Sequence, residues 1–284
     1  MNLKPNFIFF GTPDVASETL EILKEAGLLP SLIVTSPDKP QGRKMLVTSP
    51  PVKTWATKNN IPYLQPEKLN GLEFRDSFDL FIVVAYGKII PKNIIEIPKL
   101  GSINIHYSLL PKYRGASPVE SAILNGEGFT GVSIQKMEFK LDSGPIIAQE
   151  KVSINNREKA PDLRKRLIRI GAELLVKILP NYLENKITAI PQEEKEATYC
   201  QKIKKEGGLV DLVAEPPSML YNKFRAYAGW PSIFFFVNGK RIKITDAILE
   251  NGKFTIKKVL PEGKKEIKYE DFLKIQGKAL NCLN

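Results

Sequence analysis

Apolar residues follow two alternating patterns along the first two thirds of the chain. Continuous runs such as Phe7–Phe10 and Phe78–Ala85 are typical of strands that are buried on both faces of a parallel sheet. Between the runs, apolar positions recur every three or four residues, which predicts helices that cover the sheet. This alternation predicts an α/β fold with a doubly wound, mostly parallel sheet. Strands are expected at 7–10, 31–35, 61–64, 78–85, 103–107, 130–137 and 146–152, and helices at 14–26, 51–59, 118–124 and 160–179, with a short one ending at 95.

The pattern changes after the long helix, which Pro180 is expected to end or kink. Residues 186–205 are polar and basic and predict a linker. The rest alternates in short strands separated by turns, with a strong hairpin signal at Asn238-Gly239. We therefore expect domains at 1–185 and 206–284, the second a small antiparallel β-barrel. Its expected elements are a helix at 218–228 and strands at 233–237, 241–244, 254–259 and 266–269.

Composition narrows the class of protein. The 284 residues contain no apolar run of about 18, which is the length that crosses a bilayer. The N-terminal stretch lacks the apolar core and the cleavage site of a signal peptide. Cys200 and Cys282 lie far apart, and the chain has one histidine, so the sequence argues against a zinc site. We expect a reduced, cytoplasmic protein.

The net positive charge of the chain suggests a negatively charged partner but does not identify it. The formal net charge is +11, from 42 Lys and Arg against 31 Asp and Glu. Residues 204–284 alone carry 15 basic and 9 acidic side chains, a net of +6. Such an excess favours a polyanion such as nucleic acid, but many basic proteins bind none. Charge alone leaves nucleic-acid binding open.

Residues 36–51 contain four prolines, a glycine and three basic residues, a composition too irregular for a helix or a strand. A loop of this length inside a compact domain is usually functional or mobile. It is either a solvated insertion or an arm that reaches over a polyanion. In the second case Lys39, Arg43 and Lys44 would meet phosphates.

The single histidine lies in the most unusual run of the sequence. Asn104 and His106 are two residues apart on an expected strand, so they point from the same face. The amide can donate a hydrogen bond to developing negative charge, and the imidazole can pass protons. The alternative is a histidine with a purely structural role. Asp142 lies in the turn 141–145, where an aspartate also serves to stabilise the turn itself.

Two stretches of the chain are Asn104-Ile-His-Tyr-Ser-Leu-Leu-Pro-Lys-Tyr-Arg-Gly115 and Leu141-Asp-Ser-Gly144, and together they resemble the shared signature of folate-dependent formyltransferases. Two others, Phe10-Gly-Thr-Pro-Asp14 and Ser36-Pro-Asp-Lys-Pro-Gln-Gly-Arg43, resemble in particular the members of that family that act on methionyl-tRNA. The resemblance continues through Val83-Val-Ala-Tyr-Gly87 and Ala228-Gly-Trp-Pro231. The resemblance extends over essentially the whole chain. It implies a Rossmann-like formyltransferase domain at 1–185, a linker at 186–205 and an oligonucleotide-binding-like barrel at 206–284 that binds tRNA.

The resemblance also implies a reaction, in which a formyl group moves from 10-formyltetrahydrofolate to the amino group of methionine on initiator tRNA. Asn104 and protonated His106 would donate to the formyl oxygen, and Asp142 would keep His106 charged and help relay protons. No metal is needed. The folate would be held by Ser108, Leu109, Leu110 and Pro111, with backbone contacts from Tyr86 and Gly87. Lys39, Arg43 and Lys44 would reach the tRNA acceptor end, and the protein would act as a monomer in the cytoplasm, away from membranes.

Two positions depart from the family pattern, and two other functions stay open. Tyr107 stands where a small residue is usual, and its ring should alternate to the face opposite Asn104 and His106. Lys278 stands where an arginine is common. A formyltransferase acting on an amino sugar nucleotide or another small amine would use the same three residues, but it needs neither the basic loop nor the basic C-terminal part. A catalytically silent folate-binding or RNA-binding module would not need the complete set of three.

Overall fold

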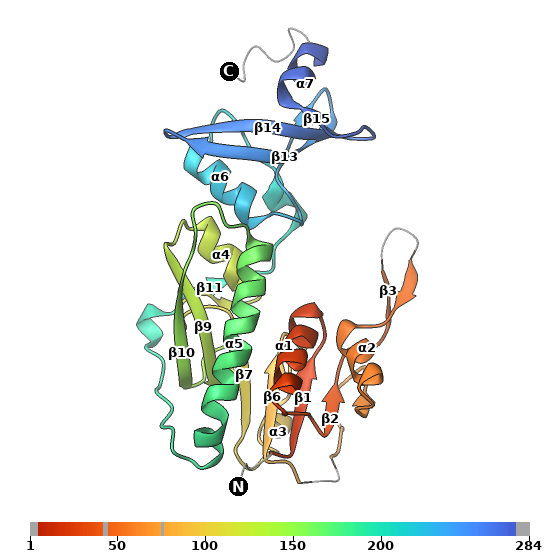
Figure 1. The fold of residues 1–284 in the computed structure, drawn as a ribbon, viewed down its shortest axis with the longest axis vertical. Coiled ribbons are helices and arrows are strands. Elements are labelled where there is room, and N and C mark those ends of the chain that lie inside the picture. The colour runs from red at the N-terminus through yellow and green to blue at the C-terminus, as the bar shows by residue number, and fades with distance from the viewer. Residues whose placement is uncertain (1–4, 42–44, 75–76, 277–284) are drawn as a thin grey trace. The chain divides into compact units, whose positions relative to one another are not determined.

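The computed structural model describes residues 5–41, 45–74 and 77–276 of the chain (Figure 1). These residues form two compact units. The first contains the described residues up to Arg114 together with 131–152 and 165–199, and the second contains 115–130, 153–164 and the described residues from 200 onward. Within this described part, no helix is both long and apolar enough to cross a lipid bilayer. The domain limits given above remain a prediction.

A seven-stranded sheet lies at the centre of the first unit, in the order β10-β9-β7-β6-β1-β2-β5. Strand β1 is parallel to β2 and β6, while β2 is parallel to β5 and β6 is parallel to β7. Strand β9 runs antiparallel to β7. The mostly parallel, Rossmann-like sheet is therefore confirmed. The strands are β1 (Phe7–Gly11), β2 (Leu32–Val34), β5 (Tyr63–Leu64), β6 (Leu80–Val84), β7 (Ser102–His106), β9 (Phe129–Lys136) and β10 (Ile146–Ser153).

Helices cover this sheet. They are α1 (Asp14–Glu25), α2 (Pro51–Lys58), α3 (Lys92–Ile95) and the larger part of α5 (Ala160–Leu183). Gly171 of α5 lies so close to β7 and β9 that a Cβ atom there would sit 2.9 Å from Ile105 Cγ2 and 3.0 Å from Val132 Cγ1. Helix α5 therefore packs against the apolar face of both strands, opposite the face that carries Asn104 and His106.

Helix α5 continues through Pro180, although the sequence predicted its end near residue 179. Proline lacks the N–H that would bond the carbonyl four residues earlier, but near a helix end only one bond is lost. The last turn is anchored because the buried Tyr182 donates a 2.8 Å hydrogen bond from its hydroxyl to the Leu100 carbonyl. Tertiary contacts thus outweigh the local helix-breaking signal.

Residues 36–51 are more regular than expected. Strands β3 (Lys39–Gln41) and β4 (Leu46–Thr48) pair antiparallel, with Lys39 opposite Thr48. Because each strand has only three residues and β3 contains a proline, the hydrophobic pattern of the sequence does not reveal this pairing. At the root of this hairpin the Asp38 carboxylate accepts hydrogen bonds from Lys53 Nζ at 2.6 Å and from Gln65 Nε2 at 2.8 Å.

The second unit contains a four-stranded sheet in the order β12-β13-β14-β15, and the paired strands run antiparallel. This confirms the small antiparallel C-terminal domain. Asn238-Gly239 and Asn251-Gly252 form the two tight turns with positive φ at all four residues, as the sequence signal predicts. The strands are β12 (Phe234–Val237), β13 (Lys240–Glu250), β14 (Lys253–Pro261) and β15 (Ile267–Lys268), and β13 and β14 are longer than expected.

Helices complete the second unit. They are α4 (Pro118–Leu124), α6 (Pro217–Ala226) and α7 (Tyr269–Gln276). Helix α7 was not predicted, because its start was assigned to a strand at 266–269. Phe272 is buried in the core of the sheet, with Tyr269 and Leu273 packed beside it at helical spacing. The core of this unit thus explains why the chain turns helical there.

Residues 186–205 have local structure of their own. They contain the 3₁₀ helix η1 (Glu194–Glu196) and β11 (Tyr199–Cys200), which pairs with β8 (Arg114–Gly115), and they lead into η2 (Lys205–Gly208). Ile190 also forms a β-bridge with Ile146 in β10. The part of this segment up to Tyr199 thus belongs to the first unit.

Candidate active site

Strand β7 places Asn104 and His106 on one face of the sheet. Asn104 lies opposite Gln135 of β9, and His106 lies opposite Ser133. Because the pleat alternates, these four side chains form a polar strip, while Ile103 and Ile105 point to the other face. Tyr107 also lies on that other face, close to Gly171 of α5. The expected orientation of its ring is therefore confirmed.

His106 is buried between two acceptors. Its Nε2 atom lies 2.8 Å from the Tyr113 carbonyl oxygen, and its Nδ1 atom lies 3.7 Å from Asp142 Oδ2. A carbonyl oxygen only accepts, so Nε2 carries a proton. The doubly protonated imidazolium is the form of the ring that presents an N–H to both neighbours. This form can also donate a hydrogen bond or a proton to a reacting group.

Asp142 reaches His106 because β9 returns antiparallel beside β7 and the next turn folds back on the strand end. The turn has little freedom, since Asp142 has φ of +47° and a Cβ atom on Gly144 would overlap the Lys136 carbonyl oxygen. The Asp142 side chain is 13% exposed. Spacing along the chain does not reveal this proximity, but the geometry brings the two predicted residues together.

The Asn104 amide is available for a substrate. Among the residues that the structure describes, its side chain makes no hydrogen bond, and it is only partly buried. An unsatisfied amide on the same face as an imidazole can donate to an oxygen that gains negative charge. The arrangement suits acyl or formyl transfer.

The predicted folate-binding residues are of two kinds. Ser108 and Leu110 are buried, and their polar atoms already bond within the protein, since Ser108 Oγ donates to the Lys112 carbonyl at 2.6 Å and Leu110 N donates to Ser133 Oγ at 3.0 Å. Leu109 and Pro111 are partly exposed beside them. This loop is therefore held in one shape from within, and its partly exposed members are the ones that remain accessible to a ligand.

Tyr86 and Gly87 follow strand β6. The Tyr86 ring packs edge-on against Phe10, and burial raises the pKa of its hydroxyl to about 12. The side chain is therefore part of the core, whereas the exposed Gly87, with φ of +80°, leaves only its backbone for contact. This arrangement is compatible with the backbone contacts expected from the sequence.

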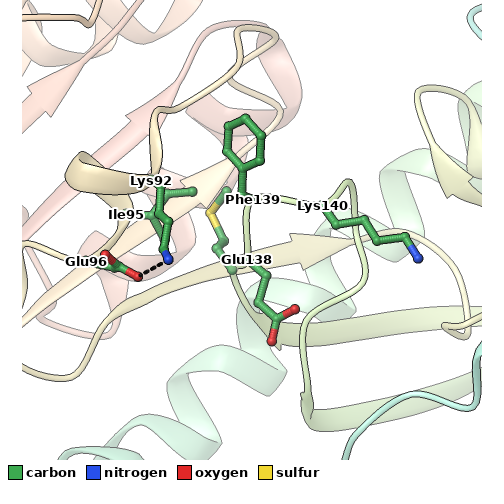
Figure 2. A pocket seen from close by; sticks show the side chains of 7 residues that line it. Lys92, Ile95, Glu96, Glu138, Phe139 and Lys140 are labelled. Atoms are coloured by element: carbon green, nitrogen blue, oxygen red, sulfur yellow. Dashed lines mark ion pairs between the residues drawn. The ribbon is translucent and has the colours of Figure 1, made fainter.

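A cavity of about 740 Å³ lies between helix α3 and the segment that leads into the Asp142 turn. Figure 2 shows the ring of Phe139 on one wall and the ion pair of Lys92 with Glu96, 3.7 Å apart, on the other. A second cavity of about 390 Å³ shares Phe139 and is bordered by Lys88 and Ile89. Neither is lined by Asn104, His106 or Asp142, but residues 137–140 connect the first directly to the turn that contains Asp142. The size fits a small organic ligand.

Of the residues predicted to contact tRNA, Lys39 lies exposed on β3. Arg43 and Lys44 lie outside the described residues, as does Lys278. Three residues that sequence reasoning missed adjoin the site, namely Arg114, Gln135 and Gln192. Arg114 belongs to the motif run, but no local pattern distinguishes the two glutamines.

The sequence profile of the family described as "Formyl transferase" matches residues 4–179, and that of "Formyl transferase, C-terminal domain" matches residues 202–258. The chain belongs to the formyl transferase family. The N-terminal match contains the whole polar strip of β7 and β9 and the Asp142 turn. The C-terminal match contains β12, β13 and most of β14.

Curated members of the family are similar over most of their length. The "Methionyl-tRNA formyltransferase" of Caldicellulosiruptor saccharolyticus is 41% identical over 248 residues, covering 84% of this chain and 78% of that protein. The protein of the same name from Staphylococcus epidermidis is 36% identical over 296 residues and covers 94% of both chains. Among solved structures, the N-formyltransferase of Helicobacter canadensis, in complex with folinic acid and dTDP-3-aminofucose, has a TM-score of 0.66 at 21% identity, with 87% of this chain and 88% of that chain covered. This likeness supports the fold.

Proposed function

We propose that the protein transfers a formyl group from 10-formyltetrahydrofolate to the amino group of methionyl-tRNA. The observation that carries the chemistry is the placement of His106 3.7 Å from Asp142, on the same sheet face as the unsatisfied amide of Asn104. The acceptor follows from relatives that bear the name methionyl-tRNA formyltransferase at 36–41% identity across most of the chain.

The three side chains divide the work of the transfer. Asn104 and the Nδ1–H of the His106 imidazolium donate hydrogen bonds to the formyl oxygen as the amine attacks and that oxygen gains negative charge. The Nδ1 atom can do so because it lies 3.7 Å from Asp142, beyond hydrogen-bond distance, while the Nε2–H stays on the Tyr113 carbonyl. One C–N bond forms to the amino group of methionine, and the C–N bond to N10 of the folate breaks. Asp142 and His106 carry the proton lost by the amine to the departing N10 atom, directly or through a water molecule. No metal takes part in these steps.

The cavity beside Phe139 supplies a place for the folate next to this chemistry. Its apolar wall suits a flat ring, and basic and acidic side chains both line it, with Lys92 paired to Glu96. We include the backbone of Tyr86 and Gly87 and the loop Ser108 to Pro111 in the folate site. Lys39, Arg43 and Lys44 would contact the acceptor end of the tRNA, and the basic C-terminal unit would contact its phosphates. Action on charged tRNA places the protein in the cytoplasm, where we expect a monomer.

A second candidate acceptor is an amino sugar nucleotide, because the Helicobacter canadensis enzyme of similar fold is described with dTDP-3-aminofucose. The identity to that protein is only 21%, and the +6 charge of residues 204–284 has no use with a small acceptor. Methionyl-tRNA is therefore the better supported substrate.

The test offers 10-formyltetrahydrofolate with methionyl-tRNA or with dTDP-amino sugars and measures the formylated product. We expect formylation of the tRNA alone. We also expect the efficiency kcat/KM with tRNA to fall by roughly tenfold or more between about 50 and 200 mM salt, since two or more phosphate contacts release counterions. Formylation of the sugar without the tRNA would overturn the assignment, and a flat salt profile would argue against the phosphate contacts.

A further inference from the structure

Four side chains of the first unit form a continuous hydrogen-bonded chain that ends at the Asp142 carboxylate. Arg114 donates to Gln192 Oε1 from Nε at 3.1 Å and from Nη2 at 2.9 Å. Gln192 Nε2 donates to Gln135 Oε1 at 3.2 Å, and Gln135 Nε2 donates to Asp142 Oδ1 at 3.1 Å. Gln192 Nε2 also lies 2.9 Å from the Asp142 carbonyl and 2.7 Å from that of Gly144. One amide therefore bonds both to the backbone of the catalytic turn and, through Gln135, to its side chain.

The direction of this chain is fixed by its first member. A guanidinium only donates, and that of Arg114 is completely buried, so the oxygen end of Gln192 must face it. The amide nitrogen of Gln192 then faces three acceptors, which turns the oxygen end of Gln135 toward Gln192 and its nitrogen end toward Asp142. As a result Oδ1 of Asp142 receives an N–H donor, and Oδ2 is the oxygen that lies toward His106.

The segment that contains Gln192 also holds the second neighbour of His106. Thr198 accepts a hydrogen bond from Tyr113 N at its Oγ1 atom, at 2.8 Å, and another from Arg114 N at its carbonyl oxygen, also at 2.8 Å. These bonds fix the stretch whose Tyr113 carbonyl accepts from His106 Nε2. Residues 192–198 thus contact the supports of both the carboxylate and the imidazole, although the sequence predicted a linker there.

We propose that Gln192, oriented by Arg114, is a positioning residue that directs the Asp142 carboxylate toward His106. The expected effect on kcat rests on the proposed function. The expected effect on the position of the Asp142 carboxylate does not. Gln192 touches neither the imidazole nor any substrate-facing atom of Asn104, so its effect on the reaction passes through Asp142.

The kinetic test uses Gln192→Leu and Gln192→Glu with methionyl-tRNA and 10-formyltetrahydrofolate. Gln192→Glu keeps an acceptor for the buried Arg114 and so protects the fold, but it removes the donor to the turn. We expect kcat to fall about tenfold in either variant with both KM values within about twofold, since one partly buried hydrogen-bonded link is lost. In an Asp142→Asn background neither substitution should lower kcat further, because coupled residues are not additive.

The matched control is Glu194→Gln. Glu194 accepts from Arg114 Nη1 at 2.8 Å on the other side of the guanidinium, and glutamine retains an acceptor there. We expect wild-type kcat from this variant. Wild-type kcat in both Gln192 variants, or a full further loss in the Asp142→Asn background, would overturn the proposal, because the residue would then have only a structural role.

A spectroscopic test does not depend on activity. His106 is the single histidine of the chain, so its ring signals in a nuclear magnetic resonance spectrum need no assignment. We expect Gln192→Leu and Asp142→Asn each to move these ring signals from their wild-type chemical shifts in the same direction, because each loses the directed carboxylate, and we expect the double variant to match Asp142→Asn. Unchanged ring signals in a folded Gln192→Leu protein would overturn the inference. Moved ring signals in a protein that does not formylate methionyl-tRNA would refute the proposed function and leave the inference standing.

Discussion

Asp142 and Asp38 are two aspartates of the first unit that lie in turn or loop segments, but their surroundings differ. The Asp142 side chain is 13% exposed and is held by the uncharged amide of Gln135, with His106 as its charged or chargeable neighbour. The Asp38 side chain is 30% exposed and is paired with the ammonium group of Lys53 at 2.6 Å. Gln65 and Ser49 also donate to Asp38.

The difference separates a carboxylate that an amide holds beside an imidazole from one that a lysine pairs between two segments. The ammonium group of Lys53 in α2 balances the charge of Asp38, and this ion pair joins the segment before β3 to α2. An amide donor such as Gln135 fixes a carboxylate without bringing a charge of its own, which is the difference between the bond to Asp142 and the lysine pair of Asp38. Two residues of one type thus acquire different roles from their partners.

The same substitution at both sites is the strongest test of this comparison. We expect Asp142→Asn to lower kcat for formyl transfer about 10²-fold or more, as loss of a proton-transfer partner does, and His106→Ala to lower it further. Asp38→Asn should leave kcat within about twofold, since Asp38 has no contact with the reacting groups. Steady-state kinetics with methionyl-tRNA, with the circular dichroism of each variant, measure the difference. Similar losses at both aspartates would show that the contrast in environment has no catalytic meaning.

The parts of the fold that sequence predicted are those where the local pattern and the tertiary structure agree. The continuous apolar runs of β1 and β6 could be identified because strands buried on both faces have no polar positions. The shared face of Asn104 and His106 follows from the period of two. The hairpin at 39–48 and helix α7 were missed because three-residue strands and a single helical turn of apolar residues give almost no periodic signal.

The site was only partly accessible from sequence for a related reason. Asp142 was selected through family resemblance, since 36 positions separate it from His106 and spacing alone favours a turn residue. Gln192 lies in a polar, basic stretch where nothing sets it apart from its neighbours. Its role depends on the return of residues 186–199 to β9 and to Arg114, which is a tertiary contact that no local pattern encodes.

The rigidity of the Asp142 turn can be tested at Gly144. A Cβ atom there would overlap the Lys136 carbonyl oxygen, so Gly144→Ala must move backbone. We expect a loss of about 1–3 kcal/mol in the free energy of unfolding, together with a fall in kcat as Asp142 shifts. Gly128→Ala is the matched control, because a Cβ atom there meets nothing within 4 Å, and it should change stability by less than about 0.5 kcal/mol. Equal stabilities in urea denaturation would contradict the proposed constraint on the turn.

The smallest expected effect is the pH dependence of the hairpin root. Hydrogen bonds from Gln65 and from Lys53 hold the pKa of Asp38 below its ordinary value of 3.8. A lowered pKa means that the carboxylate stabilises the folded state above the ordinary value, and that this contribution is lost as the pH falls through the folded-state pKa. Asp38→Asn should therefore have a slightly lower Tm than the wild type at pH 7, and the difference should shrink as the pH falls below 3.8 and through the lowered folded-state pKa. Calorimetry of both proteins across this range measures it. A difference in Tm that persists at low pH would mean that the Asp38 side chain stabilises the fold by packing and not by its charge. The two aspartates would then differ in their place in the fold but not in the use of their charge.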